Sequence, residues 1–138
     1  MLLKQPAIGR QCDPALEDLQ GKLVVQRLAS RFPTMKRLDL EGNKLGNATA
    51  QTLADHLCSG WSLNTLNLKR NCVGDAGAQR LAEVIARHPA IHMNLETNEL
   101  GKNGEDAIRD ALVTALRCGA KPNFQPYFLL RDARTVVA

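Results

Sequence analysis

The stretch LDLEGNKLG, residues 38–46, decides the fold of this chain because two later stretches repeat its pattern. Residues 66–74 have the sequence LNLKRNCVG and residues 93–101 have the sequence MNLETNELG, at steps of 28 and 27 residues. A recurrence with a period of this size indicates an array in which each repeat is one supersecondary unit. Much of the chain therefore consists of three copies of one structural unit.

Each copy predicts a short strand followed by a helix. The L-x-L pattern alternates, which is typical of a strand with one buried face. Beyond each glycine, apolar residues recur four apart, which is typical of one helix face. These pairs are Leu53 and Leu57, Leu81 and Ile85, and Ile108 and Leu112. We expect Asn47, Asp75 and Asn103 to act as N-caps, each accepting free amides of its own helix. An earlier helix is predicted over residues 13–32, with Pro14 in its first turn.

One asparagine recurs where each strand is expected to end, as Asn43, Asn71 and Asn98. At this corner the backbone leaves the sheet, and a buried side-chain amide can bond to the groups that lose their partners. Leaving such a buried group unpaired costs about 1–3 kcal/mol. We therefore expect these three residues to form a structural asparagine ladder between successive turns.

The combined pattern L-x-x-L-x-L-x-x-N resembles the leucine-rich repeat family over residues 35–116. The period and the continuations VGDAGAQRLAEVI (73–85) and LGKNGEDAIRDAL (100–112) resemble its ribonuclease-inhibitor-like subfamily. The resemblance implies an α/β fold. The expected architecture is a leucine-rich repeat solenoid, a short curved horseshoe with parallel strands on the concave face and helices on the convex face.

The repeats predict a single leucine-rich repeat domain over residues 1–138, because no unit can bury its leucines alone and the units must stack. Residues 1–34 are expected to form a degenerate N-terminal capping unit, in which Met1, Leu3 and Ile8 fit the strand positions and Pro6 replaces the asparagine. The regular repeats and the C-terminal capping unit are predicted at 35–62, 63–89, 90–118 and 119–138.

Composition and charge favour a cytoplasmic protein that binds neither nucleic acid nor a membrane. The basic excess lies in residues 1–37, with seven Lys/Arg against three Asp/Glu, and in residues 117–138, with four against one. The repeated middle holds seven Lys/Arg against ten Asp/Glu, and a nucleic-acid binder more often has a basic stripe on one face. The N-terminus MLLKQPAIGR lacks the apolar run of a signal peptide, and no run approaches the ~20 residues that span a bilayer.

Neither metal sites nor disulfides are expected from the four cysteines. Cys12, Cys58, Cys72 and Cys118 are far apart in the sequence and have no metal-site spacing, so we expect reduced thiols.

The sequence gives little support for catalysis, and we expect no catalytic residues, no metal and no cofactor. Asp55 and His56 are adjacent on a predicted helix and point about 100° apart. His92 falls on the exposed side of a strand without an orienting partner. The repeated glycines belong to the turns and not to a phosphate-binding loop. A hydrolase that uses His92 with a neighbouring carboxylate is the least favoured alternative.

The polar residues between the buried leucines are expected to project side by side from successive strands. They vary between copies while the buried positions hardly change, which is the pattern of a recognition face on a constant scaffold. The candidate partner-binding residues are Arg37, Asp39, Glu41, Thr65, Asn67, Lys69, Arg70, His92, Asn94 and Glu96.

We interpret the chain as a non-enzymatic module that binds a protein partner through the concave strand face. The alternative is a structural or self-associating segment of a larger leucine-rich repeat assembly. The chain is expected to be a monomer if the helix at 13–32 covers the N-terminal edge, and a dimer if that edge pairs with another molecule.

Overall fold

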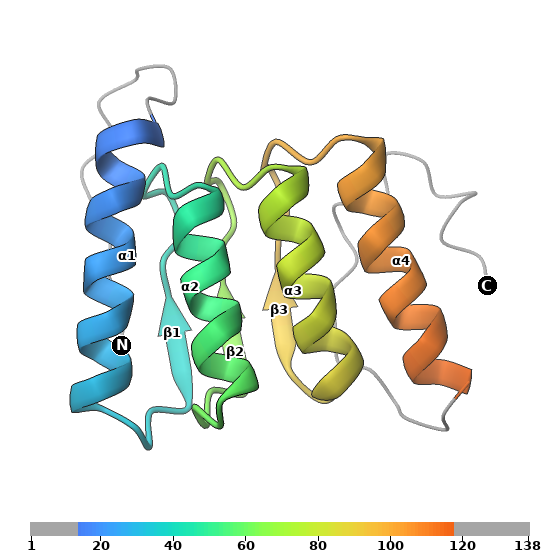
Figure 1. The fold of residues 1–138 in the computed structure, drawn as a ribbon, viewed down its shortest axis with the longest axis horizontal. Helices are drawn as coiled ribbons and strands as arrows, with labels where there is room; N and C mark the ends of the chain where they lie inside the picture. Colours follow the sequence, from blue (N-terminus) through green and yellow to red (C-terminus); the bar gives the residue numbers. More distant parts are fainter. Residues whose placement is uncertain (1–13, 118–138) are drawn as a thin grey trace.

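The computed structural model of the chain describes residues 14–117, and the side chains of residues 17–117. Helices and strands alternate in this part of the chain. The order is α1 (Pro14–Arg31), β1 (Arg37–Asp39), α2 (Asn47–Cys58), β2 (Thr65–Asn67), α3 (Asp75–Arg87), β3 (His92–Asn94) and α4 (Lys102–Arg117). Figure 1 shows the four helices side by side in chain order, with the strands behind them.

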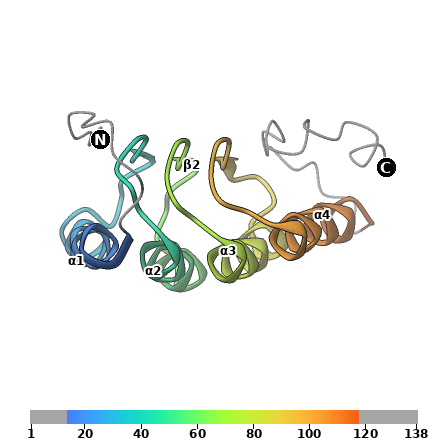
Figure 2. The same cartoon turned by 90° about the horizontal axis from the view of Figure 1, so that it is seen from above.

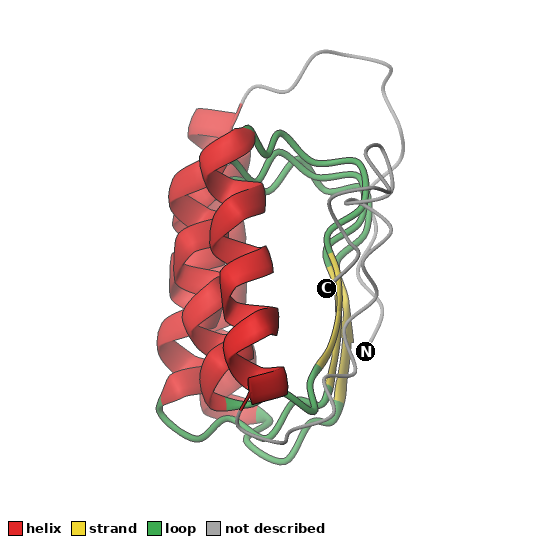
Figure 3. Cartoon of the chain, turned by 90° about the vertical axis from the view of Figure 1, so that its right-hand side faces the viewer, coloured by secondary structure: helices red, strands yellow, loops and turns green. Residues whose placement is uncertain are grey.

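The strands form one parallel sheet in the order β1-β2-β3. Its register aligns Leu38 with Leu66 and Leu66 with Met93, so the repeat alignment of the sequence is also the alignment of the strands. All four helices lie on the same side of the sheet, as the views along the molecule show (Figures 2 and 3). A repeated strand–turn–helix unit produces this two-layer arrangement because each unit stacks only on its neighbours.

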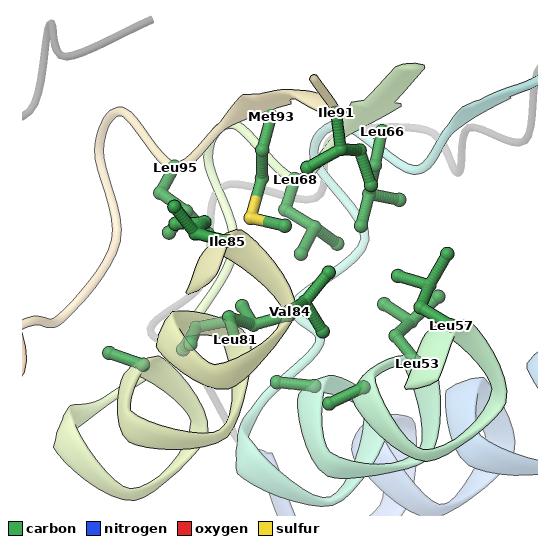
Figure 4. Packing of buried hydrophobic residues seen from close by; sticks show 14 of the residues in the cluster. Leu53, Leu57, Leu66, Leu68, Leu81, Val84, Ile85, Ile91, Met93 and Leu95 are labelled. Atoms are coloured by element: carbon green, nitrogen blue, oxygen red, sulfur yellow. The ribbon is translucent and has the colours of Figure 1, made fainter. Parts of the chain in front are cut away.

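The core between the two layers is aliphatic (Figure 4). Leu38, Leu66 and Met93 point into it from the strands, each at most 1% exposed. The helices contribute the predicted stripe, with Leu53 and Ile108 fully buried. A fully buried side chain of this size contributes about 1.5–3 kcal/mol. The short strands are thus held mainly by this packing and by the turns that follow them.

Two predictions about the chain ends lie partly outside the described residues. Helix α1 (Pro14–Arg31) agrees with the helix predicted over residues 13–32. Residues 1–13 and 118–138, which include the predicted C-terminal capping unit, are not described. Within residues 14–117 none of the helices combines the length and apolar character that crossing a membrane requires.

Candidate interaction surface

The anchor asparagine of the second repeat bonds to two successive turns. Asn71 Oδ1 accepts the backbone amides of Asn43 at 3.0 Å and Leu45 at 2.9 Å. Its Nδ2 donates to the carbonyls of Leu40 and Leu68, both at 3.0 Å. Only 5% of Asn71 is exposed. One side chain therefore joins its own turn to the turn of the preceding repeat.

The other two anchor asparagines make part of the same set of bonds. Asn98 Oδ1 accepts the amide of Val73 at 3.0 Å, and Asn98 Nδ2 donates to the carbonyls of Leu68 and Leu95. Asn43 is buried and donates to two carbonyls of its own turn. Asn71 and Asn98 therefore each bond to two successive turns, and the bonds described for Asn43 are to its own turn.

A second series of polar residues connects the helices. Asp18 of α1 accepts the amides of Gly46, Ala48 and Thr49 at the start of α2, each at 2.9 Å. Asn47 Oδ1 accepts the amides of Gly74 and of the first turn of α3 at the same distance. Each helix is thus capped by a side chain of the helix before it. We call Asp18, Asn47 and Asp75 the cap series.

Asp75 completes the cap series and corrects the predicted N-caps. Its Oδ1 accepts the amides of Gly101 and Gly104, at 2.7 and 2.9 Å, around the start of α4. The N-cap positions of α2 and α3 are glycines, which make no side-chain bond. The prediction that Asn47 and Asp75 cap their own helices was therefore wrong.

The predicted N-cap Asn103 is exposed and is the second residue of α4. Counting from the glycine that precedes each helix, Lys102 occupies the place in α4 that Asn47 and Asp75 occupy in α2 and α3. Lysine is a donor without an acceptor. The cap series therefore ends at α4.

The second glycine of the repeat motif makes room for the cap. A Cβ on Gly77 would lie 2.8 Å from Asn47 Oδ1 and 2.8 Å from the Cβ of Ala50. A Cβ on Gly104 would lie 2.6 Å from Asp75 Oδ1. Both distances are below van der Waals contact, so a larger residue would separate the helices or break the cap.

Asp18 is the buried carboxylate of the cap series, 8% exposed. Burial by itself raises the pKa of Asp18, but the hydrogen bonds from Thr49, Gly46 and Ala48 outweigh burial and hold the pKa below its ordinary value. Glu17 and Lys44 form an ion pair beside it at 3.8 Å. The charged form of Asp18 is the one that joins α1 to α2.

The candidate binding residues of the strands lie between the buried leucines, on the sheet face that the helices do not cover. The register places Arg37 beside Thr65 and Thr65 beside His92 at the start of the strands. Arg37 and Arg70 are exposed, and the other eight are partly exposed. The register brings together the six candidates within the strands, and the remaining four, Glu41, Lys69, Arg70 and Glu96, lie just beyond the strand ends; we call the ten candidates together the sheet face.

Three residues of the sheet face also have a local structural role. The Oδ1 atoms of Asp39, Asn67 and Asn94 each accept the backbone amide two positions later, at 2.9–3.0 Å. Such Asx turns end a strand by replacing a ladder bond with a side-chain bond. These residues were predicted only as binding residues, although Asp or Asn at the same place in every copy was a signal for the turn.

Two interactions cross between neighbouring repeats on the sheet face. Asn67 Nδ2 donates to Glu41 Oε1 at 3.1 Å, and Lys69 Nζ lies 3.8 Å from Glu96 Oε1. Partly exposed pairs of this kind contribute about 0–1 kcal/mol. A ligand with complementary charge could exchange them at little cost.

The backbone is left-handed just before each anchor asparagine. Gly42, Arg70 and Thr97 have φ values of 74°, 60° and 58°. Glycine adopts this conformation freely, whereas other residues pay roughly 1–2 kcal/mol. The second and third repeats therefore place side chains at a position where glycine would be more stable.

The cysteines differ from the prediction of reduced thiols. Cys58 is a free thiol, but Cys72 is disulfide-bonded, so the prediction was wrong for Cys72. Cys12 and Cys118 lie outside the described residues. In residues 14–117, no three His, Cys, Asp or Glu side chains are grouped as a metal site would require.

Comparison with known proteins agrees with this geometry. Residues 33–54 and 62–82 match the family described as Leucine Rich repeat. A stretch of 90 residues is 32% identical to Protein NLRC5 of Mus musculus and covers 64% of this chain but 5% of that protein. The chain therefore spans a small part of the length of this relative, and the ribonuclease-inhibitor-like subfamily stays a prediction. These matches, together with the parallel strands and the asparagine bonds between turns, show that the chain belongs to the leucine-rich repeat proteins.

Proposed function

We propose that this chain is a non-enzymatic, cytoplasmic module that binds a protein partner through the sheet face. The observation that supports the proposal best is the contrast between the two sides of the sheet. The inward positions repeat leucine or methionine, whereas the outward positions change from Arg37 to Thr65 to His92 along one row. A scaffold alone would not need varied side chains on its uncovered face.

The geometry of stacking supports a concave shape for this face. Packed helices lie about 8–10 Å apart, whereas neighbouring strands lie about 4.7–4.9 Å apart. When each helix is joined to one strand, the helix layer is longer than the strand layer and the stack bends toward the strands. A concave surface can contact a partner from several repeats at once.

Arg70 and His92 are the strongest candidates for direct contact. Neither side chain makes a hydrogen bond or ion pair with another residue of the described part, so binding would break no existing interaction. The backbone of Arg70 also has a left-handed conformation, with φ of 60°. Backbone strain of this kind persists where a side chain has a use, and arginine is enriched among interface hot spots.

A capture experiment tests this proposal. The chain would be immobilised and cytosolic proteins that bind would be quantified by mass spectrometry. The sheet-face variant Arg70→Ala/His92→Ala is compared with Arg87→Ala, which removes an exposed cation from the helix layer. We expect the sheet-face variant to capture at least tenfold less of the partner than the unsubstituted chain, and the helix variant to capture the same amount. Equal capture by both variants would mean that binding uses another surface.

A second candidate function, a self-associating structural segment, is favoured by exposed apolar side chains of α1. Leu19, Leu23 and Val24 are 56%, 64% and 40% exposed there. Exposed apolar side chains grouped on one helix often mark an interface. Light scattering separates the two functions, because self-association requires the molar mass to rise with concentration and to fall again in the Leu19→Glu variant.

A further inference from the structure

An apolar groove lies between α1 and the first repeat, with a volume of about 520 Å³. Leu23, Val24 and Leu28 line it from α1, and Leu40, Asn43 and Leu45 line it from the first repeat. Leu40 and Leu45 are 3% and 5% exposed, and the corresponding side chains of the next repeat, Leu68 and Val73, are fully buried. The groove is therefore the place where the core would continue if another strand preceded β1.

The sequence contains a segment with the spacing that this groove requires. Leu38, Leu40, Leu45 and Gly46 of the first repeat are separated by two, five and one residues. Residues 1–9, MLLKQPAIG, repeat these steps at Met1, Leu3, Ile8 and Gly9. We propose that residues 1–9, which lie outside the described residues, dock in this groove as a strand parallel to β1.

The bonds between the described strands define how such a strand would pair. The amides of Leu40 and Gly42 donate to the carbonyls of Asn67 and Lys69, at 2.9 and 3.0 Å. Leu3 and Gln5 correspond to Leu40 and Gly42 one repeat earlier. Their amides would therefore donate to the carbonyls of β1 and of the turn that follows it. Backbone pairing of this kind supplies affinity, while pockets for alternate side chains supply specificity.

The side chains fit the same register. Leu3 corresponds to Leu40 and Ile8 corresponds to Leu45, each one repeat earlier, so both enter the groove in this register. Leu2 then corresponds to Asp39 and faces the solvent side of the sheet.

Pro6 corresponds to Asn43, and its lack of an amide removes one turn bond. The second turn bond is kept in this register. In the repeats, the amides of Leu45 and Val73 donate to the anchor asparagine of the next repeat, and the amide of Ile8 takes the corresponding place.

The connection to α1 is also compatible with this placement. The strands end at the same end of the molecule at which the helices begin (Figure 1). In the repeats, Gly46 and Gly74 directly precede their helices. Gly9 would reach this end, and the residues between it and Pro14 can extend about 3.3–3.6 Å each to enter α1.

Two neighbouring leucines of the full chain provide a matched test. Leu3→Ala should lower the urea midpoint by on the order of 1 M, because it empties the groove, and Leu2→Ala should leave the midpoint within about 0.3 M of the original. Both substitutions remove the same atoms from the same segment, so a difference between them reports the register.

Equal midpoints for the two variants would overturn the proposal, because they would show that Leu3 does not enter the groove. The midpoint of the unsubstituted chain should also be independent of protein concentration. A midpoint that rises with concentration, together with a doubled molar mass, would show that the segment or groove is used by a second copy and would overturn docking within one molecule. If Leu3→Ala prevents folding, Leu3→Val against Leu2→Val gives the same comparison with a smaller shift.

Discussion

Replacing Asn71 by alanine tests the main structural assignment of this protein. The substitution removes the acceptor of the Asn43 and Leu45 amides and the donor to the Leu40 and Leu68 carbonyls. Asn71 is buried, so water replaces these bonds poorly. The loss should therefore exceed that of a single exposed hydrogen bond.

The magnitude follows from the groups left without partners. Each buried amide that loses its acceptor costs about 1–3 kcal/mol. The carbonyl of Leu40 keeps the bond from Asn43 Nδ2, so the carbonyls add less. We expect the free energy of unfolding to fall by about 2–4 kcal/mol. The control Asn67→Ala loses a partly exposed turn bond and one bond to Glu41, and should cost about 0.5–1 kcal/mol.

Urea unfolding followed by circular dichroism compares the two variants. With a slope of roughly 2 kcal/mol per molar urea, the midpoint should fall by about 1–2 M for Asn71→Ala and by less than about 0.5 M for Asn67→Ala. Equal midpoints would refute the reasoning, because they would place the two asparagines in equivalent surroundings.

Four further predictions follow from the helix caps, the turns and the cysteines. Gly77→Ala should lower the free energy of unfolding by about 1–3 kcal/mol, because its Cβ would meet Asn47 Oδ1; an unchanged urea midpoint would contradict the close approach. The pKa of Asp18 is lowered in the folded state, so its contribution is present above the ordinary pKa of 3.8 and is lost as the pH falls through the folded value. The stability gap between the unsubstituted chain and Asp18→Asn should therefore narrow below pH 3.8 in acid titrations, and a gap of constant size would count against the carboxylate cap. Thr97→Gly should stabilise the fold by about 0.5–1 kcal/mol by relieving its left-handed backbone, measured by the same urea unfolding; destabilisation would show that the Thr97 side chain compensates for the strain. Alkylation of unfolded protein without reductant, followed by peptide mass spectrometry, should label Cys58 and not Cys72. Labelling of both cysteines would show that Cys72 is not disulfide-bonded.

The sequence by itself determined the repeat, the order of strands and helices, and the anchor asparagines. These features are local and occur in every copy, so the periods of two and of 3.6 residues could be compared at three places in one chain. Leu66 and Met93 are buried beside Leu38 because they hold the same place in the same pattern. The candidate sheet-face residues follow from this alternation alone.

Only the tertiary structure decided which helix each cap serves. Asn47 follows a glycine at the start of α2, where the N-cap rule points to its own helix, but its oxygen accepts amides from α3. Asp18 lies in the second turn of α1, far in the sequence from the start of α2, and accepts amides about one repeat later in the chain. Each bond joins residues about one repeat apart. The repeat pattern in the sequence is the same whether a side chain caps its own helix or the next one, so the pattern cannot decide between them. The choice depends on how closely the helices pack, which the glycines at 77 and 104 permit and no local pattern specifies.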